Sequence, residues 1–479
     1  MKLLVALLLS HAVWASELTV STTSGTVHGF YNDSSAQKVR AFLGISYAEP
    51  PVGIRRWAPP VPKKSPKSHL DGHEFGPSCP LLHTPSDGDI YSVLPYSPPH
   101  PDNISEDCLS LNIWAPSRLH SKLSGSLKKA AVLVFIHGGA FVSGSSAVPF
   151  YNGAPFVRDN DNVIIVTLNY RLGIFGYPNA PGLPDGQQNV GLRDQRLAVE
   201  WVRDNISRFG GNPKRITLFG QSAGAISADM YAYTYPEDPL VHGIVLQSGT
   251  ATLFSSSDFT HSSWQNVSET LGCTQRDPAQ NLKCMRKLAV RDVLQAAALQ
   301  LFVPVQDNIT VFSNYSRRAE LGELAKVPIL VGSNAQESFT GRLDGPGPDK
   351  DTAQASTTAM FTCPAGIAAT RRDHNIPSWR YLYHGNWTNL SPVPWLGAYH
   401  SSELPLVFGT YNLAQPISRD QLLASKYIQG AWAAFAHDPH DGLSAYGWPY
   451  STLANLALDN RPEPVFTKDP LEGLCASTN

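Results

Sequence analysis

The stretch Ile216-Thr-Leu-Phe-Gly-Gln-Ser-Ala-Gly224 predicts a strand that ends abruptly and continues as a helix. Its first half is apolar and typical of a short buried strand, and the residues from Ala223 onward have helix-compatible spacing. Glycines stand two residues before and two residues after Ser222, where side chains would obstruct a sharp turn. We therefore expect the Ser222 hydroxyl at the carboxyl end of the strand, with the Ala223 amide pointing to where an oxyanion would form.

Apolar runs and helical patterns alternate along the rest of the chain. Strands are predicted at 109–114, 131–136, 163–168, 244–246 and 329–331, and a helix packed on the sheet is predicted over 189–209. This alternation predicts an α/β fold, with a central, mostly parallel sheet flanked by helices. Ligands of such folds collect at the carboxyl ends of strands, where Ser222 and the turn His137-Gly138-Gly139-Ala140 both lie.

The first residues are typical of an export signal. Lys2 is followed by a Leu-rich run and by small residues near Ala15, so residues 1–15 are interpreted as a signal peptide and residues 16–479 as a single domain. No linker, repeat or low-complexity tract divides that domain, and no hydrophobic anchor tail ends it. A net charge of −2 without a basic stripe makes nucleic acid an unlikely partner class. We expect a secreted protein, whose oligomeric state the sequence does not reveal.

Cysteines and glycosylation sequons also indicate an oxidising route. The six cysteines leave fifteen possible pairings when only the sequence is considered. Candidate glycosylation sites are Asn32, Asn103, Asn266, Asn308, Asn314, Asn386 and Asn389. The sequon at Asn205 is discounted most, because it falls inside an amphipathic helical pattern.

Three motifs resemble the type-B carboxylesterase and cholinesterase family of α/β-hydrolases over nearly the whole mature chain. They are Phe209-Gly-Gly-Asn-Pro-Lys-Arg-Ile-Thr-Leu-Phe-Gly-Gln-Ser-Ala-Gly224, Glu106-Asp-Cys-Leu-Ser-Leu-Asn-Ile-Trp-Ala-Pro116 and Phe42-x-Gly-Ile-x-Tyr-Ala-x-Pro-Pro51. The first is long enough to be highly specific. Gln221 stands where the family usually has an acidic residue, Ser110 where an aromatic residue or Thr is common, and Ser46 where proline is usual.

The resemblance implies a serine esterase that needs no cofactor and no metal. Ser222 would be the nucleophile, His400 the base and Glu337 the carboxylate that orients it, in the chain order Ser, acid, His. Backbone amides of Gly139, Ala140 and Ala223 would form the oxyanion hole, and Ser248 would support the three side chains from behind. A rival reading of His437-Asp-Pro-His440-Asp as a metal pair is weaker, because no third cluster completes such a site.

The same resemblance implies three disulfides and two structural ion pairs. The disulfides would join Cys79 to Cys108, Cys273 to Cys284 and Cys363 to Cys475. The ion pairs would join Arg56 to Glu106 and Arg171 to Asp194.

Substrate choice is less determined than reaction type. The loop between Cys79 and Cys108 lacks the tryptophan that cholinesterases use to hold a quaternary ammonium and offers only Tyr91 and Tyr96, so we expect poor choline-ester selectivity. Six prolines in this loop argue against a lipid-seeking lid. A lipase-like or cholinesterase-like specificity stays an alternative for the small-molecule ester substrate, as does a non-catalytic interaction module.

One segment departs from the family in length. Glu337 and His400 are closer together than is usual in the family, and the shortening falls in 341–360. There Gly341-Arg-Leu-Asp-Gly-Pro-Gly-Pro-Asp-Lys350 predicts a flexible junction in place of a helix. The shortening is either a natural trimming or a deletion in the gene model.

Overall fold

The computed structural model describes residues 17–32, 38–81, 88–97, 102–117, 129–160, 162–253, 258–372, 375–469 and 475. The expected signal peptide, residues 1–15, lies outside this part of the chain. Among the described residues, no helix has both the length and the apolar character needed to cross a membrane.

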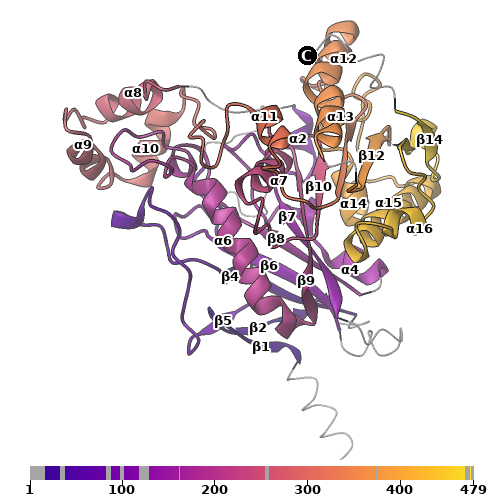
Figure 1. Ribbon diagram of the computed structural model, residues 1–479, viewed down its shortest axis with the longest axis horizontal. Coiled ribbons are helices and arrows are strands. Elements are labelled where there is room, and N and C mark those ends of the chain that lie inside the picture. Colours follow the sequence, from indigo (N-terminus) through magenta and orange to yellow (C-terminus); the bar gives the residue numbers. More distant parts are fainter. Residues whose placement is uncertain are drawn as a thin grey trace, which may run out of the picture.

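A sheet of eleven strands forms the centre of the molecule (Figure 1). Its strands are β3 (Phe30–Tyr31), β4 (Val39–Ser46), β6 (Ser110–Pro116), β7 (Ala130–Ile136), β8 (Val163–Leu168), β9 (Gly211–Gln221), β10 (Gly243–Gln247), β11 (Ile329–Asn334), β12 (Ser378–Tyr383), β13 (Thr452–Leu456) and β14 (Val465–Lys468). They follow the order β14-β13-β12-β11-β10-β9-β7-β8-β6-β4-β3. Neighbours from β8 through β13 pair in parallel, and the pairs at both edges are antiparallel. The predicted α/β-hydrolase fold class is confirmed.

Helices cover both faces of this sheet, and strand β7 shows why. Val132, Val134 and Ile136 belong to one hydrophobic core, whereas Leu133 and Phe135 belong to the other. Because successive side chains of a strand point to opposite faces, a continuous apolar run such as 131–136 requires cover on both sides. Helices α6 (Val190–Asn205) and α7 (Ala223–Thr234) supply residues to the first core. Helices α4 (Ala154–Asp159), α14 (Leu404–Phe408) and α15 (Arg419–His437) supply residues to the second.

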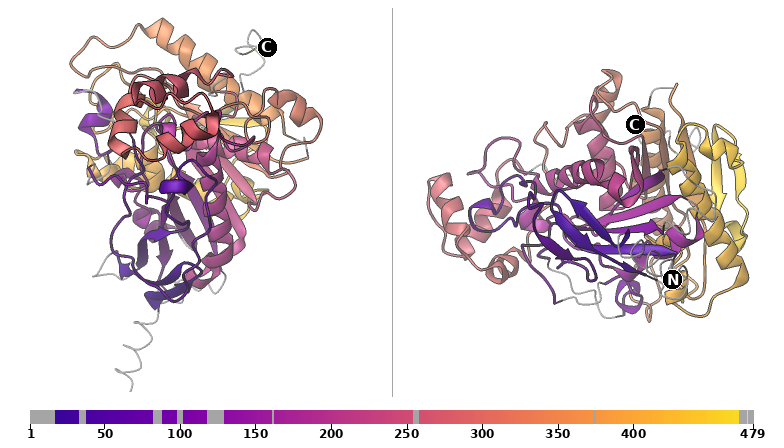
Figure 2. Two further views of the ribbon diagram at one scale, coloured as in Figure 1. Left: turned by 90° about the vertical axis from the view of Figure 1, so that its left-hand side faces the viewer. Right: turned by 90° about the horizontal axis from the view of Figure 1, so that it is seen from below.

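The remaining helices are short. Helices α8 (Ser262–Thr270), α9 (Pro278–Met285) and α10 (Val290–Ala297) form a satellite core with Trp57 at one end of the molecule, and α16 (Gly442–Ala445) lies at the other (Figures 1 and 2). The others are α2 (Ile90–Val93), α5 (Gly173–Gly176), α11 (Tyr315–Glu320), α12 (Lys350–Thr357) and α13 (Cys363–Thr370). A small separate sheet joins β1 (Thr19–Thr22), β2 (Gly25–His28) and β5 (His69–Asp71).

The shortened segment after Glu337 is docked against its surroundings. Residues 341–349 contain no helix, and α12 begins at Lys350. The Leu343 amide donates a hydrogen bond of 2.8 Å to the Gly88 carbonyl. Leu343 and Trp395 also pack in a small apolar cluster around Ile90. The junction therefore lies against the first disulfide loop, which contributes contacts where the family usually has helices.

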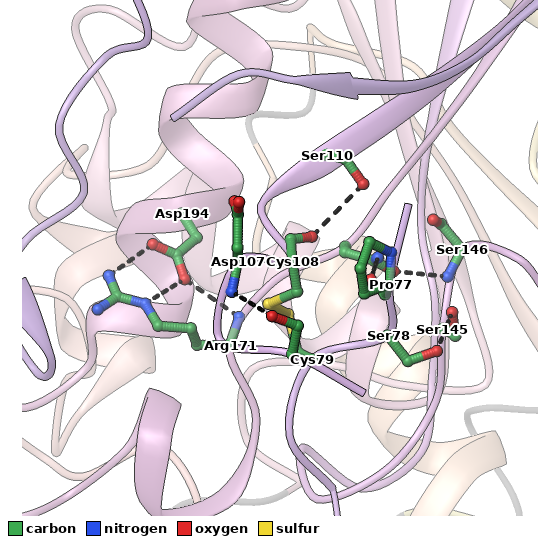
Figure 3. Close-up of a disulfide and its surroundings, with 12 residues drawn as sticks. Pro77, Ser78, Cys79, Asp107, Cys108, Ser110, Ser145, Ser146, Arg171 and Asp194 are labelled. Carbon is green, nitrogen blue, oxygen red and sulfur yellow. Dashed lines mark hydrogen bonds and ion pairs between the residues drawn. A yellow bond between two sulfur atoms is a disulfide. The ribbon is translucent and has the colours of Figure 1, made fainter. Parts of the chain in front are cut away.

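The cysteines are joined as Cys79–Cys108, Cys273–Cys284 and Cys363–Cys475, the pairs that the resemblance implies. At the base of the first disulfide loop, the Pro77 carbonyl accepts a hydrogen bond of 2.9 Å from Asn169 Nδ2, and the Ser78 hydroxyl donates one of 3.0 Å to Ser145 (Figure 3).

Both expected ion pairs are present as well. Arg56 and Glu106 form two short contacts of 2.6 and 2.7 Å. Arg171 and Asp194 are fully paired beside the Cys79–Cys108 disulfide, with side chains 3% and 0% exposed (Figure 3). Arg56–Glu106 joins two loops, and Arg171–Asp194 joins the loop after β8 to helix α6, so both have a structural role.

One glycosylation candidate conflicts with the fold. Asn389 is only 6% exposed, and its side-chain amide donates hydrogen bonds to the carbonyls of Ala414 and Tyr411. A glycan needs that amide nitrogen and open space, so the structure argues against modification of Asn389. Asn205 is fully buried, in agreement with its discounting. The other candidate asparagines, 32, 103, 266, 308, 314 and 386, are exposed.

We expect Gly224→Ala to destabilise the fold, because a Cβ at this position would collide with the carbonyl of Ile136 at the end of β7. Overpacking of this kind costs about 1–3 kcal/mol, and backbone cannot yield as a flexible side chain can. Urea unfolding followed by circular dichroism should show the loss. The control is Gly345→Ala, where the nearest atom would be 3.2 Å from the added Cβ. Equal stability of both variants would contradict the tight packing of Gly224 against the Ile136 carbonyl.

Candidate active site

Ser222 lies on the strained turn that the sequence predicts. Strand β9 ends at Gln221 and α7 begins at Ala223, and Ser222 between them has φ 56° and ψ −124°. This region of φ/ψ space is costly for a residue with a side chain, by about 1–3 kcal/mol. The surrounding chain holds it there, since the Ser222 amide donates to the Gln247 carbonyl at 2.8 Å and its carbonyl accepts from the Ile226 amide at 2.9 Å. The Ser222 side chain remains partly open to solvent.

Glu337 and His400 meet beside this turn. Glu337 lies three residues after the end of β11, and its Oε1 accepts a hydrogen bond of 2.6 Å from the Asn334 amide. Its Oε2 lies 2.5 Å from Nδ1 of His400, although 63 residues separate the two. The Glu337 side chain is fully buried and that of His400 is 20% exposed. Because the carboxylate accepts from Nδ1–H, the second ring nitrogen, Nε2, carries the lone pair in the neutral imidazole.

The charges around His400 favour its protonated form. Burial disfavours the imidazolium, but the charge of Glu337, its hydrogen bond and the charge of Glu403 together raise the pKa of His400 above its ordinary 6.5. A histidine with such a pKa remains an effective proton acceptor near neutral pH.

The Ser222 hydroxyl forms no hydrogen bond with His400 among the described residues. Instead, the amide nitrogen Nε2 of Gln221 lies 3.1 Å from Nε2 of His400. The structure thus brings Glu337 and His400 into direct contact and leaves Ser222 next to the residue that touches the histidine. Catalytic hydrogen bonds are often long in an enzyme without its substrate, so this geometry does not exclude Ser222 from the reaction.

The turn after β7 supplies backbone donors near Ser222. Gly139 has φ 109° and Ala140 has φ 53°, and a Cβ on Gly139 would collide with the Ser143 carbonyl. Within the described part of the chain, no hydrogen bond uses the backbone N–H groups of Gly139, Ala140 or Ala223. Ala223 is the first residue of α7, where free N–H groups and the helix dipole favour negative charge. These donors are available to a developing oxyanion.

His137, just before this turn, is a structural residue. It is 1% exposed and stacks on Tyr170, and its Nδ1 lies 2.8 Å from the Gly138 carbonyl. Burial lowers the pKa of His137 to about 4, so the ring is neutral at pH 7.

Sequence reasoning did not assign a role to the buried carboxyl group of Glu403. Its oxygens accept hydrogen bonds from Gln247 Nε2 at 3.0 Å and from Asn334 Nδ2 at 2.7 Å. Burial and the nearby charge of Glu337 raise the pKa of Glu403 to about 7. A signal was present in the sequence, since Glu403 lies only three residues after His400, but nothing local shows that this carboxyl group is buried.

The first disulfide loop holds the His400 segment through two tyrosines. Tyr91, on α2, donates a hydrogen bond of 2.6 Å to the backbone carbonyl of His400. Tyr96 lies 3.0 Å from the Tyr399 hydroxyl and donates to the Ser401 carbonyl at 3.2 Å. These rings pack edge to face with one another. The two tyrosines considered as cation-binding aromatics are therefore engaged in holding this segment.

The expected role of Ser248 finds no supporting contact, and neither does the rival reading of a metal pair. The Ser248 hydroxyl is buried and forms no hydrogen bond with a described residue, so its supporting role stays a prediction. In the part of the chain that the structure describes, no group of three or more His, Cys, Asp or Glu side chains is arranged to hold a metal ion, so the pair His437 and His440 gains no third ligand.

Comparison with known proteins relates this arrangement to enzymes that act on esters. A model of the carboxylesterase family matches residues 16–343. Chlorogenic acid esterase of Aspergillus niger is 38% identical over 460 residues, covering 92% of this chain and 88% of the relative. Secreted lipase 5 of Gibberella zeae is 36% identical over 505 residues, covering 96% and 94%. Acetylcholinesterase of Bungarus fasciatus is 29% identical over 537 residues, covering 97% and 86%.

We expect Tyr91→Phe to loosen the segment around His400, because the variant removes one hydrogen bond worth about 1 kcal/mol. Hydrogen–deuterium exchange should then be about fivefold faster in peptides covering 399–404. Tyr450→Phe, at an exposed tyrosine, is the matched control. Unchanged exchange in Tyr91→Phe would show that this contact does not hold the segment.

Proposed function

Because the chain belongs to the carboxylesterase family and is a carboxylic ester hydrolase, we propose that Ser222, His400 and Glu337 are its nucleophile, base and orienting carboxylate. The observation that carries this proposal is the 2.5 Å contact between His400 Nδ1 and the buried carboxylate of Glu337. It leaves Nε2 as the proton acceptor, on the side where Gln221 lies.

The proposed reaction proceeds through an acyl-enzyme. The Ser222 hydroxyl attacks the ester carbonyl while its proton passes to Nε2 of His400, which then protonates the leaving alcohol. Water then attacks the carbonyl of the acyl-enzyme while its proton passes to His400. His400 returns the proton to Ser222 as the acid is released. Glu337 keeps the proton on Nδ1 and stabilises the imidazolium that forms in each step.

The backbone amides of Gly139, Ala140 and Ala223 are proposed as the oxyanion hole. Their N–H groups are unused within the described residues, and two of them belong to a turn with positive φ. Each such donor is typically worth about 3 kcal/mol of barrier, because it is already aimed at the position where negative charge develops.

The substrate is proposed to be a neutral carboxylic ester. The tyrosines of the first disulfide loop donate to backbone carbonyls of the His400 segment, which argues against a dedicated site for quaternary ammonium groups. One relative is a chlorogenic acid esterase, so esters of aromatic acids belong in the first substrate series. Ser222, Glu337 and His400 are all retained, which disfavours a non-catalytic interaction module.

Secretion is part of the proposal. Three disulfides persist in oxidising compartments, and one relative is a secreted lipase. Both observations are consistent with an extracellular protein.

Hydrolysis of a p-nitrophenyl ester series, with and without Ser222→Ala, tests the proposed function. The wild type should hydrolyse the series and take up one phosphonate label per chain by intact mass, and Ser222→Ala should lose both, because the nucleophile is gone. Folded wild-type protein that neither turns over nor takes up label would contradict the proposal. A rate that rises above the critical micelle concentration would favour the lipase-like alternative.

The role of Glu337 predicts a pH dependence. The base must be neutral to act, so activity should fall as pH falls through the pKa of His400, and this midpoint should lie above 6.5. Glu337→Gln should lower kcat/KM by about a thousandfold or more and move the midpoint to lower pH, because the charge that stabilises the imidazolium is removed. Glu237→Gln, at an exposed position, is the control. An unmoved midpoint in Glu337→Gln would contradict this role.

A further inference from the structure

The proton-accepting nitrogen of His400 already has a partner other than Ser222. Its Nε2 lies 3.1 Å from the side-chain amide nitrogen of Gln221, and within the described residues no hydrogen bond joins it to the Ser222 hydroxyl. Gln221 directly precedes Ser222 in the chain.

The chemistry of the contact determines its direction. Nδ1–H of His400 donates to Glu337, so Nε2 of the neutral ring can only accept. The amide nitrogen of Gln221 is a donor and its oxygen is an acceptor, so only the observed orientation gives a hydrogen bond. The Gln221 amide therefore occupies the lone pair that Ser222 needs.

The backbone of Gln221 is fixed in the sheet. Its side chain belongs to a residue only 2% exposed, and its backbone pairs with Gln247 in the parallel ladder between β9 and β10. Its oxygen would be 2.7 Å from a Cβ placed on Gly138, so the amide lies between the proposed oxyanion turn and the imidazole.

Building on the proposed function, we propose that Gln221 is a positioning residue that engages Nε2 of His400 in the resting enzyme and yields it to Ser222 when an ester binds. The donor stabilises the neutral imidazole and opposes the imidazolium until the amide turns away. A glutamate in its place would accept a hydrogen bond from the imidazolium, stabilise its charge and so act in the opposite sense.

Other groups around His400 also influence its pKa. Glu337, in the turn after β11, and Glu403, at the start of α14, both favour the imidazolium. The Tyr91 hydroxyl reaches the His400 carbonyl, and Phe361 contacts the ring without carrying a charge, with ring centroids 5.3 Å apart. Among the described residues, Gln221 is the neutral donor that opposes the two carboxylates.

The test is the pH dependence of phosphonate labelling, measured by intact mass in wild type, Gln221→Met and Gln221→Glu. Labelling needs the neutral base but not product release, so it reports His400 directly. Loss of the donor in Gln221→Met should raise the midpoint of the acid limb by about half a unit, and the carboxylate in Gln221→Glu should raise it by about one unit or more. Gln295→Glu, on the exposed side of α10, makes the same charge change away from the site.

The outcomes separate this inference from the proposed function. Wild-type protein that does not label would contradict the proposed function itself. Wild-type labelling with midpoints unchanged in both Gln221 variants, and only a lower plateau rate, would assign Gln221 a merely structural role and overturn the inference. If either variant fails to fold by circular dichroism, the other decides the question, since both side chains are close to glutamine in size.

Discussion

The close approach of helix α7 to the end of strand β7 is the constraint on which the rest of the site depends. A Cβ on Gly224 would meet the Ile136 carbonyl, and one on Gly220 would meet the backbone of Gly224. This contact forces the chain to turn within one residue, and Ser222 takes the strained conformation that results. Ala223 follows directly as the first residue of α7, so the proposed nucleophile and one proposed oxyanion donor are positioned together.

The histidine reaches this point by a different physical route. His400 is on no strand of the sheet, and its place depends on side-chain contacts from three distant segments. Glu337 holds Nδ1, Tyr91 holds the backbone carbonyl, and Gln221 holds Nε2. The first disulfide loop, which carries Tyr91, therefore helps to support the site. It also binds the shortened segment, because its Gly88 carbonyl accepts a hydrogen bond from the Leu343 amide. Shortening this segment has not left the histidine unsupported.

Burial reduces the negative charge around the histidine, because it raises the pKa of Glu403. Two carboxyl groups lie near the histidine, and burial together with the charge of Glu337 raises the pKa of Glu403 to about 7, so this group is about half ionised at pH 7. The amide donors of Asn334 and Gln247 satisfy its oxygens. A neutral glutamine beside the serine adds no third carboxylate to this cluster, which fits a site for neutral esters better than one for cations.

The sequence by itself determined the fold class, the strand-to-helix turn at Ser222 and several central strands, because continuous apolar runs and obligatory glycines are local signals. The run at 163–168 became β8 without change of bounds. Glu337 and His400 were reached by resemblance, since no local pattern distinguishes them. The contacts of Gln221 and Tyr91 with His400, those of Glu403 with Asn334 and Gln247, and the burial of Asn389 were decided only by the tertiary structure. The contacts join residues 69 to 309 positions apart, and burial depends on what packs above a residue, so both are set by the packing of the whole chain.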